Sequence, residues 1–105
     1  MAWIYLLLAG LLEVVWAFSM KSSDGFSKIT PTIITAVAML ASIGLLALAM
    51  KSLPLGTAYT IWTGIGAVGA FIVGIAILGE PVNTLRVLAA VLIVSGLVMM
   101  KLSSS

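Results

Sequence analysis

One carboxyl group, Glu13, lies near the middle of an apolar stretch that runs from Trp3 to Met20. As an α-helix this stretch spans about 27 Å, because each residue adds roughly 1.5 Å, and that length is close to the thickness of the hydrocarbon core of a bilayer. Placing a carboxylate at such a depth costs at least about 2.5 kcal/mol. Burial disfavours the ionised form, so the carboxyl readily binds a proton. When it is ionised, it attracts a cation in place of the proton. The depth and type of this residue therefore predict exchange chemistry.

A structural ion pair is the alternative interpretation of Glu13. Every Lys and Arg of the chain lies near the end of an apolar segment. The sequence thus offers no basic partner at the depth of the carboxyl. Because ionisable residues inside membrane spans usually mark ion or proton pathways, we interpret Glu13 as a site for which a proton and a cationic substrate compete.

The composition is that of a membrane protein. Of the 105 residues, 63% are hydrophobic and 8% are charged, which differs from the balance found in soluble domains. The absence of Cys and His excludes disulfides, Cys or His metal sites, and Cys–His or Ser–His catalysis. We therefore expect no enzyme activity, no metal and no cofactor. The five basic side chains are scattered, so no basic patch indicates nucleic-acid binding.

Turn residues divide the chain into four apolar runs. The breaks fall at residues 21–28, 51–56 and 79–83, where Ser, Asp, Gly and Pro gather. We expect an all-α membrane protein that forms one transmembrane domain over residues 1–105, with both termini on one side. The expected helices cover about residues 3–20, 29–50, 57–78 and 84–100.

The basic residues divide almost evenly between the two expected sides of the membrane. Three of them fall on one side, and two fall on the other beside the N-terminal amine: Lys21, Lys28 and Arg86 against Lys51 and Lys101. Orientation normally follows an excess of Lys and Arg on the cytoplasmic side, so this balance gives almost no signal. Insertion in both orientations and a weak bias that still fixes one orientation both remain open.

Enclosing Glu13 requires more than one chain. A carboxylate that faces lipid is not tolerated, and four short helices could barely surround it. We therefore expect an oligomer in which Glu13 from two copies faces one cavity. The fourth apolar run has no charge between Arg86 and Lys101, and we expect it to serve as a packing or dimerisation helix.

Helical spacing places Gly10 and Trp16 on the same face as Glu13, three residues to either side. Gly10 is expected to leave space over the carboxyl. Trp16 offers an aromatic face for a cation and an N–H donor, and it lies too deep for an interfacial aromatic belt. Ser42 is the polar residue nearest the middle of the second run. It can bond a carbonyl of its own helix or Glu13, and spacing leaves both open.

The third run combines aromatic and small residues. Tyr59 and Trp62 share a helix face. Gly64 and Gly66 lie at midspan, where two glycines weaken a helix and permit a hinge. This combination predicts a helix that both packs closely and bends.

The residues of several segments resemble the small multidrug resistance family, and the resemblance covers essentially the whole chain. The segment around Glu13 and the segment from Tyr59 to Gly66 are together highly specific for it. The matching segments are Gly10 to Ala17, Lys21 with Gly25 and Phe26, Pro54 to Gly66, and the pattern of the fourth run. Within that family the chain is similar to the guanidinium-exporter subtype, because Trp16 follows Glu13 at three residues. The polyaromatic-drug subtype typically has a glycine there.

The resemblance implies an antiparallel, dual-topology homodimer with one shared binding site. The glutamate of each copy, which matches Glu13, would exchange protons for a cation by alternating access. The positions matching Ser42, Tyr59 and Trp62 would support the glutamates by hydrogen bonds, and Trp16 would line the pocket.

The function implied by this resemblance is a proton-coupled antiporter of the bacterial inner membrane. It would export guanidinium and small guanidinyl compounds, and also some small quaternary ammoniums. Thr60 stands where the family commonly has alanine, so we expect this residue to modulate selectivity. The alternatives are a broad quaternary-ammonium exporter of the same family and a non-transporting membrane assembly subunit. The implied partners are a second copy, a small cation, protons and the lipid bilayer.

Overall fold

Four helices joined by short connections make up the computed structural model, which describes residues 1–103. They are α1 (Ala2–Ser22), α2 (Ile29–Ala49), α3 (Leu55–Ala76) and α4 (Thr84–Ser103). Each helix is long and apolar enough to cross a membrane, and residues 1–103 contain no strand. The prediction of an all-α protein with four membrane-spanning helices is therefore confirmed.

The ends of the helices differ by a few residues from the expected ones. α3 lies two residues closer to the N-terminus than predicted, because the chain turns into the helix directly after Pro54. It ends early because Gly79 adopts a positive φ of 68° and the N–H of Glu80 donates to the carbonyl of Gly74 at 3.0 Å. α1 and α4 are longer than predicted, since their last turns include Lys21 and Lys101.

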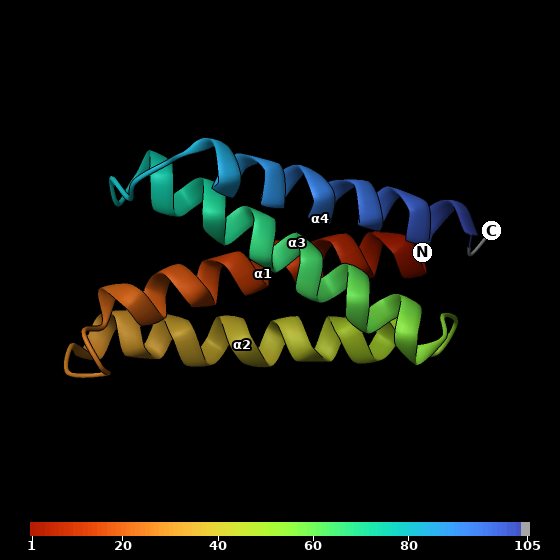
Figure 1. Cartoon of the computed structure of the whole chain (residues 1–105). Helices are drawn as coiled ribbons and strands as arrows, with labels where there is room; N and C mark the ends of the chain where they lie inside the picture. Colours follow the sequence, from red (N-terminus) through yellow and green to blue (C-terminus); the bar gives the residue numbers. More distant parts are fainter. Residues whose placement is uncertain (104–105) are drawn as a thin grey trace.

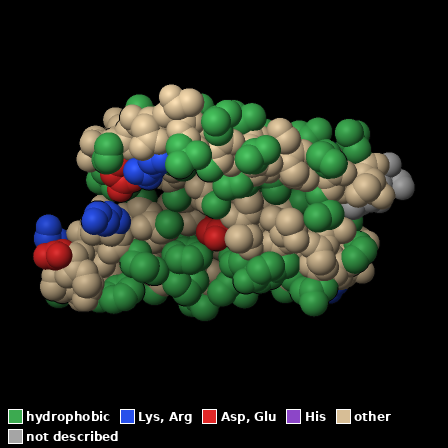
Figure 2. All heavy atoms as spheres, viewed as in Figure 1, with side chains coloured by type: hydrophobic (Ala, Val, Ile, Leu, Met, Phe, Trp, Pro, Cys, Tyr) green, Lys and Arg blue, Asp and Glu red, His purple; other side chains and the backbone are tan. Residues whose placement is uncertain are grey.

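The helices run back and forth along one long axis (Figure 1). The α1–α2 and α3–α4 connections lie at one end of the molecule, and both marked termini lie at the other end with the α2–α3 connection. In Figure 2, basic and acidic side chains gather at the first end, whereas hydrophobic side chains cover much of the length. The two ends therefore correspond to the two membrane sides inferred from the order of the charges.

α1 is the central helix of the packing. It packs against both α2 and α3, whereas α2 and α3 have little contact with each other, and α4 packs along α3. The Cα atoms occupy a flat volume of 42 × 35 × 16 Å. Because a helix with its side chains is about 10–12 Å across, the molecule is at most two helices thick. None of the residues of α4 is buried, so one chain leaves this helix largely uncovered.

Two glycines of α3 allow neighbouring helices to approach closely. A side chain at Gly66 would collide with the carboxyl group of Glu13 in α1, and a side chain at Gly64 would collide with Leu97 in α4. Small residues at contact points are the usual means of close packing between membrane helices. Both glycines therefore lie within one continuous helix and allow close contacts with the neighbouring helices. Their role as a hinge stays a prediction.

Replacing Gly64 by Ala should lower the free energy of unfolding by about 1–3 kcal/mol, the usual cost of overpacking a tight contact. The added methyl group would overlap the side chain of Leu97. The measurement is an unfolding titration with dodecyl sulfate in mixed micelles. Gly44→Ala is the control, because no atom lies within 4 Å of the added carbon there. Equal stabilities of the two variants would contradict close packing of α4 at Gly64.

Candidate functional site

The carboxyl group of Glu13 lies where α1 crosses α3. It occupies the space that the missing side chain of Gly66 leaves open. The residue is half-buried, and its Oε1 atom is buried without a hydrogen-bond partner in residues 1–103. A buried acceptor without a partner costs about 1–3 kcal/mol. The carboxyl is therefore available to a proton or to a ligand that donates N–H groups.

The indole of Trp16 also has a buried polar atom without a hydrogen-bond partner in the described part of the chain. Its Nε1 atom is buried, and no described residue accepts its hydrogen bond. Trp16 follows Glu13 by three residues, so the unpaired donor and the unpaired acceptor lie on one face of α1. Because buried polar atoms are rarely left unpaired, these two atoms mark the candidate binding site.

Ser42 and Trp62 form a hydrogen-bond network that joins three helices. Nε1 of Trp62 donates to Oγ of Ser42 at 2.9 Å, and Oγ of Ser42 donates to the carbonyl of Ala9 at 2.6 Å. Ala9 precedes Glu13 by four residues. The network therefore fixes α2 and α3 against the turn of α1 that comes before the carboxyl.

Neither of the two partners that helical spacing allows for Ser42 is the one observed. The hydroxyl is fully buried and bonds the backbone of α1, rather than its own helix or Glu13. The small side chain of Ala9, which is also fully buried, allows α2 to approach the backbone of α1 closely enough for this bond. Sequence spacing describes the faces of one helix and does not reveal a backbone acceptor on another.

Tyr59 extends the aromatic surface of this cluster. Its ring lies 5.5 Å from that of Trp62, centroid to centroid, at an interplanar angle of 59°. The residue is 52% exposed. The structure thus brings Tyr59, Trp62 and Ser42 together. Since Oε1 of Glu13 bonds none of them in one chain, their support of the glutamates stays a prediction.

Helical spacing predicts open space beside Gly10, but in the structure this space is filled. A side chain at this position would collide with Ile65 of α3, whose Cβ atom would lie 2.7 Å from the added carbon. The prediction is wrong because α3 crosses α1 closely and Ile65 fills the gap. Sequence reasoning missed Ile65 altogether, since an isoleucine in an apolar run carries no distinguishing signal. Thr60 lies exposed on α3.

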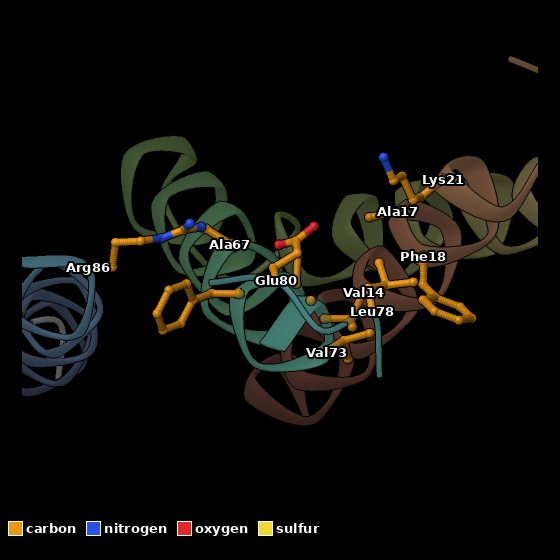
Figure 3. Close-up of a pocket in the computed structure, with 12 residues that line it drawn as sticks. Val14, Ala17, Phe18, Lys21, Ala67, Val73, Leu78, Glu80 and Arg86 are labelled. Atoms are coloured by element: carbon orange, nitrogen blue, oxygen red, sulfur yellow. The ribbon is translucent and has the colours of Figure 1, made fainter. Parts of the chain in front are cut away.

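A cavity of about 320 Å³ lies between α1 and α3 and reaches the α3–α4 connection (Figure 3). We call it the α1–α3 cavity. Its lining begins at Val14 and Ala67, the residues that follow Glu13 and Gly66, and includes Lys21, Glu80 and Arg86 at its outer end. The cavity therefore leads from the charged end of the molecule toward the candidate site.

Comparison with known proteins gives a consistent result. A family model described as Small Multidrug Resistance protein matches residues 1–94. A guanidinium exporter of Yersinia pestis is 61% identical over 104 residues, which are 99% of this chain and 100% of that protein. Guanidinium exporters of Escherichia coli strain K12 and Salmonella typhi are 59% and 60% identical, and each match covers 99% of both chains.

Removing the hydroxyl of Ser42 should destabilise the protein. Ser42→Ala leaves Nε1 of Trp62 without its acceptor, and Trp62→Phe removes the donor. Each change should cost about 1–3 kcal/mol of unfolding free energy. Because both remove the same bond, the double variant should cost less than the sum by about 0.6 kcal/mol. The measurement is a double-mutant cycle in dodecyl sulfate titrations, and strictly additive costs would contradict the coupling.

Proposed function

Because the chain belongs to the small multidrug resistance family, we propose that it exports guanidinium and small guanidinyl compounds in exchange for protons. It is a multi-pass membrane protein, which in bacteria belongs to the inner membrane. The observation that carries the proposal is the pair of buried, unpartnered polar atoms, Oε1 of Glu13 and Nε1 of Trp16, within a membrane-spanning helix. The names of the curated relatives support guanidinium as the exported ion.

Competition at Glu13 would couple the two ions. Guanidinium is planar, and its N–H groups match the two oxygens of a carboxylate in a bidentate pair. A proton on the same carboxyl removes the negative charge and one acceptor, so each ion displaces the other. The indole of Trp16 would supply a flat surface over which a planar cation can lie.

Selectivity follows from the same contacts. A quaternary ammonium has no N–H group, so it would leave Oε1 of Glu13 unpaired. We therefore propose that small quaternary ammoniums are weaker substrates and that Thr60 modulates this preference. A broad quaternary-ammonium exporter is the second candidate, supported by the family match alone. A non-transporting assembly subunit is disfavoured by the unpaired carboxyl.

We also propose that the four helices form one transmembrane domain and that two copies assemble as an antiparallel homodimer. Three observations support this arrangement. No residue of α4 is buried, the chain is too flat to enclose Glu13, and its basic residues are balanced between the two ends. In the dimer, Ser42, Tyr59 and Trp62 would orient the two Glu13 carboxyls.

Glu13→Gln should abolish guanidinium-driven proton movement, because the amide keeps the shape of the side chain but cannot bind a proton or form an ion pair. The measurement is the current from proteoliposomes on a solid-supported membrane. Asp24→Asn, which removes a carboxyl in the α1–α2 connection, should leave the current unchanged. An undiminished current in Glu13→Gln would refute the role of Glu13. A current with a bulky quaternary ammonium but none with guanidinium would favour the second candidate.

Both orientations should be found in intact cells. The natural chain has no Cys, so of the copies with a single Cys introduced at the N-terminus, one part should react with an impermeant reagent in intact cells and the rest only after the cells are permeabilised. Two or three lysines added within residues 21–28 should fix one orientation and impair transport, and an oppositely fixed partner should restore it. Labelling of the otherwise unmodified protein from one side only would exclude dual topology.

A further inference from the structure

The carboxylate of Glu80 is held at the outer end of the α1–α3 cavity. Glu80 follows α3, yet its side chain folds back onto that helix, where a side chain at Gly74 would collide with Oε1. The N–H of Glu80 donates to the carbonyl of Gly74 at 3.0 Å. The end of α3 therefore fixes the backbone of Glu80, and the glycine makes room for its carboxylate in the lining of the cavity.

The guanidinium group of Arg86 lies in the same part of the cavity. It lies over the ring of Phe71 in α3, with its central carbon 5.6 Å from the ring centroid. The backbone of Arg86 is fixed in the first turn of α4, where its N–H donates to Oδ1 of Asn83 at 2.9 Å. Figure 3 shows Glu80 between Arg86, which extends from α4, and Lys21, which extends from α1.

The outer end of the cavity thus combines an aromatic face, a carboxylate and a guanidinium group. An aromatic face and a carboxylate are the two surfaces that a planar guanidinium prefers, since it stacks on the first and donates paired hydrogen bonds to the second. In the structure the guanidinium group of Arg86 itself lies over the aromatic face of Phe71. The arrangement has the chemistry of a guanidinium site that already contains a tethered guanidinium.

We propose that Glu80 and Phe71 form an outer guanidinium site, through which the substrate passes toward Glu13, and that Arg86 is a tethered competitor for this site. The inference rests on the proposed function and adds a second binding step to it. An arriving guanidinium ion displaces the group of Arg86 from Phe71 and donates to the carboxylate of Glu80. It then lies in the cavity whose inner lining begins beside Glu13.

Glu80 also lowers the positive charge at the outer end of the cavity. Lys21 and Arg86 line the cavity with Glu80, so the end carries two positive groups and one negative group. Without the carboxylate, two uncompensated positive charges would repel an arriving cation. Glu80 is therefore required both to bind guanidinium and to lower this repulsion.

The first test compares the guanidinium concentration that gives half-maximal current in proteoliposomes. Glu80→Gln should raise it about two- to fivefold, the range of an exposed charge interaction, and should change the maximal current little because Glu13 is intact. Gly74→Ala keeps the charge but displaces the carboxylate, so it should have the same effect. The matched controls are Asp24→Asn, a carboxyl outside the cavity lining, and Gly56→Ala, where the added carbon meets no atom within 4 Å.

The second test separates competition from simple charge. Arg86→Lys keeps the charge but loses the planar group, so it should lower the half-maximal concentration, and it should have no effect in a Phe71→Leu background, which lacks the ring over which Arg86 lies. If only charge matters, Arg86→Lys will match the unmodified protein, and Arg86→Gln will lower the value equally in both backgrounds. That result would overturn the competition by Arg86.

These measurements distinguish failure of the proposed export function from failure of the outer guanidinium site. Absence of any guanidinium current in the unmodified protein would refute the proposed function. Normal current in that protein, with unchanged half-maximal concentrations in Glu80→Gln and Gly74→Ala, would refute the outer site alone. If Gly74→Ala does not yield folded protein, Glu80→Gln decides the question.

Discussion

The carboxyl group of Glu13 has to be accommodated where water cannot satisfy its hydrogen bonds. Around it the chain provides a glycine, Gly66, and a crossing of α1 with α3. One turn earlier, Ser42 and Trp62 attach α2 and α3 to the carbonyl of Ala9. The polar bonds between the helices thus stabilise the surroundings of the carboxyl and leave its Oε1 atom unpaired. This arrangement gives up stability, and it keeps a hydrogen-bond acceptor available to a proton or a ligand.

Glycines of α3 accommodate both carboxyl groups that face this helix. Gly66 lies against Glu13, and Gly74 lies against Glu80. The two glycines are eight residues apart, which corresponds to about 12 Å along a helix axis. The α1–α3 cavity lies along this part of α3. One helix can therefore present two carboxylates in sequence to a cation that moves along it.

The sequence predicted the features that depend on one segment at a time. Hydropathy predicted four spans, and the lone charge at midspan predicted that Glu13 has no basic partner, which agrees with its Oε1 atom being buried and unpaired within residues 1–103. The partner of Ser42 and the filling of the space at Gly10 by Ile65 were not predictable. Both depend on where α2 and α3 cross α1, and periodicity within one helix carries no information about the partner at a crossing. The turn at Gly79 also shifted the end of α3, because local backbone hydrogen bonds decide where a helix stops.

α4 has a consequence for how this protein is handled outside its native membrane. None of the residues of α4 is buried, so this helix makes few contacts with its own chain. Lipid or another protein molecule must therefore supply most of its contacts. In the proposed homodimer a second copy supplies these contacts, and mass action would then make the apparent stability depend on the protein-to-lipid ratio. Melting temperatures of such a dimer would be comparable only between samples with the same mole fraction of protein in lipid or detergent.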